Sequence, residues 1–271
     1  MKTPISYYGG KQQLLQHILP LIPDHNLYVE PFFGGGAVYW AKEPAKCEVV
    51  NDVNMNIVNF YEVLKHSYFD LRKLVEATLH SRETYKKALI IYDCPWLFPD
   101  NPVLRAWAFW VATNQAFSGH IGSGWGYDRE KKARTIQNKI DAFQEDLSNR
   151  IRYTQIECNE AHKVIESRDT EDTFFYVDPP YIDSNQGHYG GYTHEHFRRD
   201  LEVLSKVKGK FLLSSYPSEI LNDYIAKNGW YSVSVDKALS AGNGSASPTR
   251  RRKTEMLTAN FPITLKDNDN N

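Results

Sequence analysis

The sequence is poor in cysteine and in long apolar runs. Its three cysteines, Cys47, Cys94 and Cys158, are scattered and odd in number, which excludes a disulfide framework and the spacing of a Cys/His metal site. We expect small reduced core residues there, and no metal. No apolar run approaches the roughly 18 residues that span a bilayer, and the first residues lack the apolar core of a signal peptide. The sequence predicts a cytoplasmic protein without membrane contact.

The sequence also lacks an excess of charge of either sign, because the net charge is −1. Global charge therefore gives no reason to expect a nucleic-acid partner, and any phosphate contact must come from local clusters. No obligate protein partner is evident. The 271 residues, 41% of them hydrophobic, suffice for one large domain or for a domain with an insert.

The first part of the chain reads as the opening of a doubly wound α/β domain. After a helical pattern over 11–22, we expect a strand at 27–29, a glycine turn, a helix from 37, a strand at 47–50 and a helix at 57–65.

Residues 66–150 change character and show no clear strand pattern. Their helical patterns, at 71–79, 104–113 and 131–150, flank a glycine-rich loop at 116–127. The sequence thus predicts a helical insert at 66–150 in a domain formed by 1–65 and 151–271. Further strands of that domain are expected at 151–153, 174–177, 210–214, 231–235 and 255–261.

The tetrapeptide Asp178-Pro179-Pro180-Tyr181 follows an apolar run typical of a buried strand. Two prolines cannot continue a central ladder, because they lack the N–H group and fix φ. The chain must leave the sheet at Asp178 and hold a carboxylate, two prolyl carbonyls and a ring on a stiff turn. Ligands bind at such strand ends in open α/β sheets. A turn that only caps the core would use the same residues, so the tetrapeptide alone leaves both interpretations open.

Three further motifs have the composition of a ligand site. Gly34-Gly35-Gly36 permits a sharp turn and close approach of a ligand, although its spacing is not GxGxxG. Asp52 ends the next strand, where an acidic residue often holds ribose hydroxyls, although it could equally cap the following helix. Glu30 adds an acceptor for an amino group or a ribose hydroxyl. Residues 6–11 combine aromatic rings, two glycines and Lys11, which suits an adenine edge and a carboxylate as well as a simple helix cap.

These motifs occur in the order seen in the Dam-like class, or alpha group, of DNA adenine methyltransferases, which the chain resembles along almost its whole length. The stretches that carry the resemblance are 6–11, 28–38, 51–52, 178–181 and the tail 255–261. The resemblance implies a Rossmann-like methyltransferase sheet with an inserted helical target-recognition subdomain. It also implies methyl transfer from S-adenosylmethionine to the 6-amino group of an adenine flipped out of double-stranded DNA.

The resemblance assigns roles by position. The cofactor residues would be Tyr7, Lys11, Glu30, Phe32, Gly34, Gly35, Gly36, Asp52 and Asp178. Asp178 and the Pro179 carbonyl would accept the two N–H groups of the amine, Pro180 would stiffen the turn, and Tyr181 would stack on the base. One of the aromatic residues that follow would cover the other face of the base or the cofactor, or would simply pack. These residues are His188, Tyr189, Tyr192 and Phe197.

Two basic runs flank the expected cleft, and both are candidates for phosphate contacts, although a charge run is usually a solvated face. The DNA-binding candidates are Arg129, Lys131, Lys132, Arg134, Arg250, Arg251 and Arg252, with Asn114, Ser118 and His120 as base-reading groups. Relatives that read GATC carry an arginine in the loop that matches 114–123, where it could bind guanine. No arginine is present here, so we do not expect GATC as the target.

Two alternatives stay open at this stage. A turn of this kind also serves methyl transfer to other planar amino groups, namely cytosine, adenine in RNA or a protein glutamine. A relative that binds DNA without catalysis is the second alternative, although the intact motifs argue against it.

Overall fold

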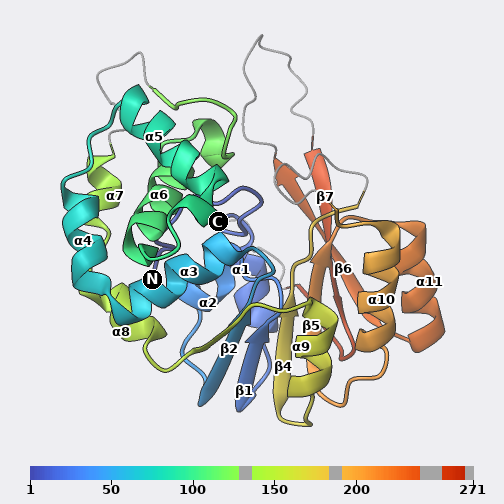
Figure 1. The fold of residues 1–271 in the computed structure, drawn as a ribbon. Coiled ribbons are helices and arrows are strands. Elements are labelled where there is room, and N and C mark those ends of the chain that lie inside the picture. Colours follow the sequence, from blue (N-terminus) through green and yellow to red (C-terminus); the bar gives the residue numbers. More distant parts are fainter. Residues whose placement is uncertain (128–135, 183–190, 239–251, 266–271) are drawn as a thin grey trace, which may run out of the picture. The chain divides into compact units, whose positions relative to one another are not determined.

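The computed structural model describes residues 1–127, 136–182, 191–238 and 252–265. The chain divides into two compact units. Unit 1 comprises Met1–Gly10 and Phe33–Glu160, and unit 2 comprises Lys11–Phe32 and Ala161–Asn271. Figure 1 labels most of the helices and strands of both.

Unit 2 is built on five strands in the order β1-β4-β5-β7-β6. Their bounds are β1 Leu27–Glu30, β4 Thr173–Val177, β5 Lys210–Ser215, β7 Arg252–Ala259 and β6 Tyr231–Ala238. Strands β1, β4 and β5 are parallel, whereas β7 runs antiparallel to both β5 and β6. Every residue of β4 is buried, as expected for a central parallel strand covered on both faces.

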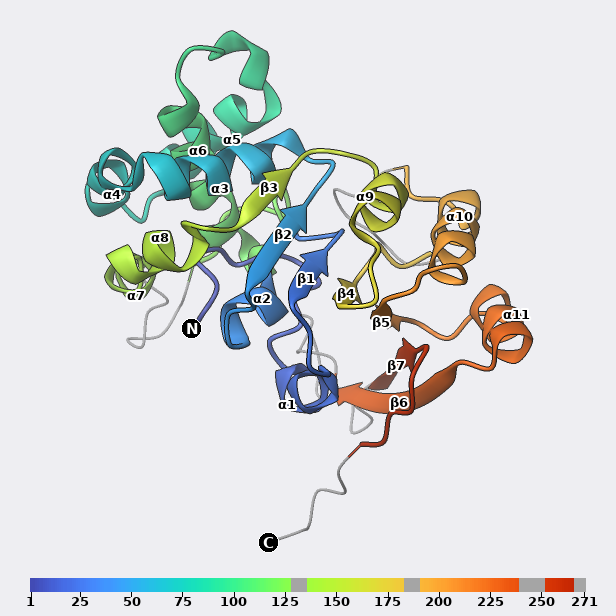
Figure 2. The ribbon, with the colours of Figure 1, turned by 90° about the horizontal axis from the view of Figure 1, so that it is seen from below.

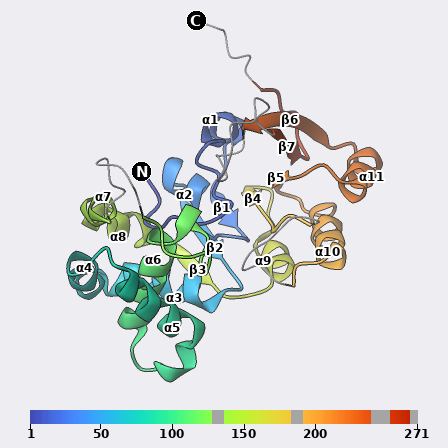
Figure 3. The ribbon, with the colours of Figure 1, turned by 90° about the horizontal axis from the view of Figure 1, so that it is seen from above.

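Helices cover both faces of these strands. Figures 2 and 3 show α9 (Ala161–Arg168), α10 (His194–Leu204) and α11 (Glu219–Asn228) on one face and α1 (Leu15–Ile18) on the other. A short 3-10 turn, η1 (Leu19–Leu21), follows α1 directly. Helix α11 is well delimited, because the Ser218 side chain caps its first turn and Gly229 ends it in the left-handed conformation at φ 64°.

Unit 1 contains the parallel pair β2 (Cys47–Asn51) and β3 (Gln155–Glu157), together with α2 (Ala37–Ala41) and α3 (Met55–His66). Its other helices are α4 Tyr68–Glu76, α5 Arg82–Asp93, η2 Pro95–Leu97, α6 Pro102–Asn114, η3 Phe117–Gly119, α7 Gln137–Asp141 and α8 Glu145–Ile151. Helix α6 packs against α3, α4 and α5 (Figure 3), and its run from Ala108 to Thr113 is fully buried. Such a helix, apolar on all sides, forms the core of its unit.

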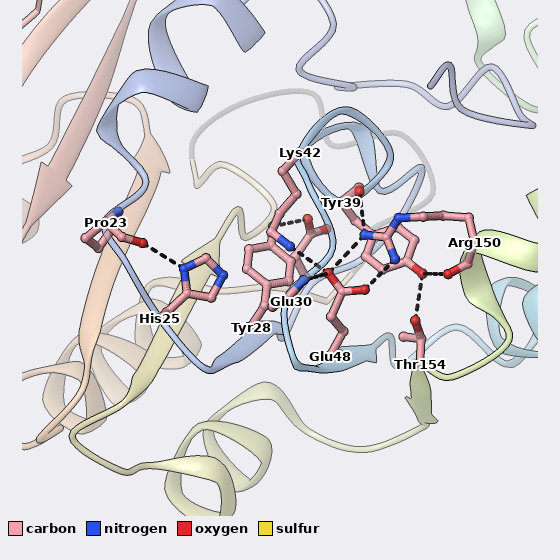
Figure 4. A network of polar contacts seen from close by, with 10 residues as sticks. Pro23, His25, Tyr28, Glu30, Tyr39, Lys42, Glu48, Arg150 and Thr154 are labelled. Carbon is pink, nitrogen blue, oxygen red and sulfur yellow. Dashed lines mark hydrogen bonds and ion pairs between the residues drawn. The ribbon is translucent and has the colours of Figure 1, made fainter.

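A buried ion cluster ties β2 to α2 and α8 within unit 1 (Figure 4). Glu48 Oε1 lies 2.6 Å from Lys42 Nζ and 2.9 Å from Arg150 Nη2, and Arg150 also bonds the other carboxylate oxygen. Burial raises the pKa of Glu48, but the hydrogen bonds from Arg150 and Lys42 outweigh it and the pKa is lowered. The carboxylate therefore stays ionised and holds the three elements together.

The predicted α/β class is confirmed, whereas several predicted bounds are wrong. The strand expected at 151–153 lies at 155–157, because Ile151 continues the apolar face of α8 and is buried as its last residue. The pattern over 136–150 gives two helices, α7 and α8, with a break at 142–144. Helix α5 was not predicted from the sequence. All named elements in the described part of 66–150 are helices, and their status as a separate insert stays a prediction.

Other sequence-based expectations concern what the chain lacks. Among the described ranges, no helix combines the length and the apolar character needed to cross a bilayer. In the same part of the chain no group of three or more His, Cys, Asp or Glu side chains is arranged to hold a metal ion. The three cysteines are free, but Cys158 is exposed and the other two are half-buried, so the expectation of core positions is wrong.

Candidate active site

Asp178 follows the last residue of β4 and points one carboxylate oxygen into a polar cluster of unit 2. Its Oδ1 lies 2.7 Å from Lys11 Nζ and 3.3 Å from the hydroxyl of Tyr181. No described residue donates a hydrogen bond to Oδ2, and the side chain of Asp178 is 20% exposed to solvent. One oxygen is thus fixed by the protein, and the other has no donor among the described residues.

Lys11 is the only cation in this cluster as far as the described contacts show, and it is 4% exposed. Its Nζ atom lies 3.4 Å from Glu255 Oε1, besides the contact with Asp178. It also lies 4.7 Å from the centre of the Tyr181 ring, within the range of a cation–π contact. A single ammonium group therefore faces two carboxylates and one aromatic ring.

The protonation of this cluster reflects burial opposed by charge. Burial lowers the pKa of Lys11, but the charges of Asp178 and Glu255 together outweigh it, so the pKa is raised and the ammonium persists. Burial raises the pKa of Asp178 above its usual value; Lys11 opposes this effect, and the Glu255 charge adds to it. Asp178 therefore holds a proton more readily than an exposed aspartate, while Lys11 at 2.7 Å favours its ionised form.

Glu255 and Ser214 belong to this cluster, and reasoning from the sequence missed both. Glu255, on β7, is 2% exposed and accepts a hydrogen bond from Ser214 Oγ on β5 at 2.9 Å. The alternation of inward-facing and outward-facing residues along β7 could have indicated Glu255. Glu255 shares a face with Leu257 and Ala259, so a charged side chain was placed in a buried row.

The hydroxyl of Tyr181 points into the same cluster, within hydrogen-bonding reach of Asp178, Ser214 and Glu255. Burial raises its pKa well above the usual value, so the group stays a neutral donor. Its ring packs against Tyr216 with 4.3 Å between ring centres. The two rings line a cavity of about 220 Å³ together with Pro179, Pro180 and Pro217.

The glycine turn lies in unit 1, just before α2. Gly34 and Gly36 have φ values of 47° and 62°, which side chains other than glycine adopt rarely. A Cβ atom at Gly36 would also lie 2.4 Å from the Phe33 ring, and one at Gly35 would lie 3.0 Å from Tyr7 Cβ. The turn therefore requires glycine for its conformation and for its packing.

Asp52 connects this turn with the start of α3. Its Oδ2 accepts a hydrogen bond from Gly34 N at 2.8 Å, and its Oδ1 accepts one from Asn54 N at 2.9 Å. Burial raises the pKa of Asp52 to about 6, although both backbone bonds act against the shift. Asn54, rather than Asp52, caps α3 through its side chain. Each carboxylate oxygen keeps a second acceptor site.

Titration of Asp52 should make stability depend on pH. Because its folded pKa lies near 6 and its unfolded pKa near 3.8, the folded state binds the proton more tightly. This contribution to stability is present at low pH and is lost as the pH rises through 6. Between pH 4 and 7, the free energy of unfolding of the wild type relative to Asp52→Asn should fall by up to about 3 kcal/mol. Urea unfolding at stepped pH measures this difference.

The exposed Asp100 of the same unit offers a matched control, since Asp100→Asn removes a carboxylate that is not buried. Parallel pH dependences for the wild type and Asp52→Asn would contradict the assignment.

A comparison with known families decides the class of the protein. The sequence profile of the D12 class of N6 adenine-specific DNA methyltransferases matches residues 7–239. The chain belongs to this family. The predicted resemblance, the predicted enzyme class and the predicted action on adenine in DNA are thereby confirmed.

Individual relatives agree with the family. The type II methyltransferase M1.LlaDCHI of Lactococcus lactis subsp. cremoris is 30% identical over 275 residues, which covers 93% of each chain. The DNA adenine methylase of Escherichia coli strain K12 is 21% identical over 279 residues, or 95% of each chain. The DNA N-6-adenine-methyltransferase of Escherichia phage P1 is 29% identical over 66% of this chain and 24% of its own length.

Three other residues predicted to bind the cofactor of the methyltransferase make contacts within their own units. Tyr7 is half-buried, with its ring 6.2 Å from Phe109. Glu30 is 2% exposed and accepts a hydrogen bond from the Tyr28 hydroxyl (Figure 4). Phe32 meets Tyr192 edge to face at 5.9 Å. Their contacts with a cofactor stay predictions.

The predicted base-reading residues of the methyltransferase lie against its N-terminal segment. Asn114 accepts a hydrogen bond from Ser6 N at 3.1 Å, and the ring of His120 lies 4.9 Å from that of Tyr8. A Cβ atom at Gly119 would lie 3.1 Å from Ser6 O. The motif at 6–8 and the loop after α6, far apart in sequence, thus form one surface of unit 1. The roles of these residues in reading bases stay predictions.

Most of the basic candidates fall outside the described residues, as do His188 and Tyr189. These candidates are Arg129, Lys131, Lys132, Arg134, Arg250 and Arg251. Arg252 begins β7, but its side chain and that of Ser118 also lie outside the description.

Proposed function

We propose that this methyltransferase uses S-adenosylmethionine to methylate the 6-amino group of an adenine flipped out of double-stranded DNA. The observation that carries the proposal is the arrangement of Asp178. Lys11 and Tyr181 lie against its Oδ1, and its Oδ2 has no partner among the described residues. An ionised acceptor fixed in this way suits an amine that must donate a hydrogen bond while it reacts.

The reaction at the amine requires no covalent intermediate with the protein. An exocyclic amine conjugated to a purine is a weak nucleophile. Asp178 Oδ2 accepts one of its N–H groups, and the Pro179 carbonyl accepts the other, which directs the nitrogen lone pair away from both acceptors. Fixed acceptors also stabilise the positive charge that develops on this nitrogen, and the methylated nitrogen then gives up one N–H proton through the Asp178 carboxylate to solvent. The stiffness of Pro179 and Pro180 means that little reorganisation is needed during the reaction.

The cavity beside the turn is lined by Pro179, Pro180 and Tyr181 but not by Asp178, and it is a suitable place for the ring of the target base, with the amino group directed toward Asp178. Its volume of about 220 Å³ is below the roughly 300–1,000 Å³ of sites for larger ligands. Walls formed by Tyr181, Tyr216 and proline rings present flat apolar surfaces to a purine. Because a duplex hides the amino group, the base must leave the stack to reach such a cavity.

The residues that we assign to the cofactor fit its chemistry. A bound S-adenosylmethionine supplies an activated methyl group on a sulfonium. The glycine turn at 34–36 carries no side chains, so its backbone can approach the methionine portion closely. Asp52 offers two acceptor positions to ribose hydroxyls. Tyr7, Lys11, Glu30 and Phe32 complete the proposed set.

Contacts with DNA are assigned to the helical segment 66–150 and to the two basic runs. The surface formed by Asn114, His120 and Tyr8 would read bases, and the arginines and lysines would contact phosphates. The loop at 114–123 lacks arginine, so we propose a target other than GATC. A role as the modification partner of a restriction enzyme is compatible with the type II relatives.

The test is incubation of purified protein with methyl-labelled S-adenosylmethionine and unmethylated duplex DNA, followed by digestion to nucleosides. We expect label in N6-methyldeoxyadenosine alone. Label in a methylated cytosine, or transfer only to RNA or to a protein glutamine, would favour another amino acceptor. Absence of cofactor binding by calorimetry would favour a non-catalytic DNA-binding protein. Sequencing of the methylated positions would then define the target.

A further inference from the structure

Glu255 has no part in the function proposed so far, although it is among the most buried charged residues of unit 2. Three donors surround it within that unit. Lys11 Nζ lies 3.4 Å from its Oε1, Ser214 Oγ donates to it at 2.9 Å, and the Tyr181 hydroxyl also bonds it. A carboxylate held in this way is costly to bury and has a fixed position.

We propose that Glu255 is a positioning residue for methyl transfer, which holds Lys11 and Tyr181 against one oxygen of Asp178 and keeps the cluster negatively charged. This inference rests on the proposed function, because it assigns Glu255 a part in the same reaction.

The charge balance of the cluster supports this role. Lys11 contributes one positive charge, and Asp178 and Glu255 each contribute one negative charge, so these three groups together carry −1, with Glu30 acting on the neighbouring Tyr176 beside them. Without Glu255, Lys11 would neutralise Asp178 and the cluster would carry no net charge. The amine becomes positive as it gains a methyl group, and a negative cluster stabilises that charge in a site of low polarity.

The hydrogen bonds support the geometric part of the role. Lys11 bridges Asp178 and Glu255, whereas the single hydroxyl proton of Tyr181 goes to the nearer carboxylate, Glu255, with Asp178 Oδ1 at 3.3 Å. In the described contacts, both groups approach Asp178 at Oδ1. Ser214, from the neighbouring strand, fixes the Glu255 carboxylate itself.

Several titratable and polar groups face Glu255, and its charge acts on their pKa values. These groups are Lys11 from the segment before α1, Tyr176 on β4, Asp178 and Tyr181 after β4, and the uncharged Ser214 on β5. The Glu255 charge raises the pKa of both Asp178 and Lys11. Its neutralisation should therefore lower the pKa of Asp178.

The test is Glu255→Gln, which keeps the shape and one acceptor oxygen but removes the charge. At the pH optimum, kcat should fall about tenfold, while KM for DNA and for the cofactor changes less than about threefold. The acid limb of the pH–rate profile should move to lower pH. Glu219→Gln, an exposed glutamate on α11 of the same unit, is the matched control and should leave all of these quantities unchanged.

A second measurement needs no activity. The carboxyl carbon of Asp178, labelled with ¹³C and assigned with Asp178→Asn, should titrate at lower pH in the Glu255→Gln apoprotein than in the wild type. An unchanged midpoint together with an unchanged kcat would overturn the inference. If the wild type transfers no methyl group, the proposed function fails, and the titration still decides whether Glu255 acts on Asp178.

A third variant covers the case in which Glu255→Gln does not fold. Glu255→Asp keeps the charge but shortens the side chain by one carbon, so it loosens the hold on Lys11 and Tyr181. We expect the acid limb to stay near that of the wild type, while kcat falls severalfold. A wild-type kcat in this variant would show that the position of the carboxylate is unimportant and would overturn the inference.

Discussion

Replacement of Asp178 by alanine is expected to lower kcat for adenine methylation about a thousandfold, which is the size of effect seen when a preorganised polar group at a reaction centre is removed. In the proposed mechanism, the variant loses the acceptor that orients the amine and the charge nearest to the reacting nitrogen. Asp178→Asn keeps the shape and one acceptor, so its loss should be smaller. Transfer of labelled methyl under saturating DNA and cofactor measures both variants.

The fold should survive this substitution. Lys11 keeps Glu255 as a partner at 3.4 Å, so Asp178→Ala leaves no buried cation alone. Circular dichroism and cooperative urea unfolding check this point, and Asp223→Ala, an exposed aspartate on α11, provides the matched control. Full activity in a folded Asp178→Ala protein would contradict both the mechanism and the proposed place of the reaction.

Replacement of Lys11 by methionine should destabilise the protein by about 3–5 kcal/mol at pH 8, because two buried carboxylates then lack their cation. The effect should depend on pH. Lys11 lowers the pKa of Asp178, so its removal raises that pKa further above the unfolded value. A raised folded pKa of a carboxyl stabilises at low pH and destabilises as the pH rises. The deficit should therefore shrink at pH 5.

Urea unfolding at pH 5 and pH 8 measures this deficit. Lys208→Met, an exposed lysine of the same unit, should change the free energy of unfolding by less than about 0.5 kcal/mol at either pH. If Lys11→Met proves as stable as the control, Lys11 is not the cation that compensates the buried charges of Asp178 and Glu255.

The sequence was sufficient to predict elements whose local pattern admits one solution. The apolar run before Asp178 and the two prolines after it required a buried strand that ends there, and β4 ends at Val177. The glycine run at 34–36 indicated a sharp turn before a helix, and Gly36 has φ 62° at the start of α2. The strand predicted at 151–153 failed because Ile151 fits equally well on the apolar face of a helix, and only packing decides between the two.

Lys11 shows where such reasoning ends. The sequence placed it near a cofactor by resemblance alone, and nothing in residues 6–11 indicates that Asp178 and Glu255 neutralise it. The same holds for Asn114, which was predicted to read bases and which accepts a hydrogen bond from Ser6. Long-range pairs of this kind leave no periodic pattern in the sequence, because their members are separated by many residues.

By itself, the sequence determined the class of chemistry through its resemblance to the family, which the turn at 178–181, the glycine turn and their order carry. The tertiary structure alone decided the surroundings of Asp178. Burial and the converging side chains of Lys11, Tyr181 and Glu255 set its charge and leave one of its oxygens without a described partner. The balance between burial and the neighbouring charges depends on distances between strands and segments that are far apart in the chain. Because the energy between two charges changes steeply with their distance, these effects cannot be read from the order of the residues.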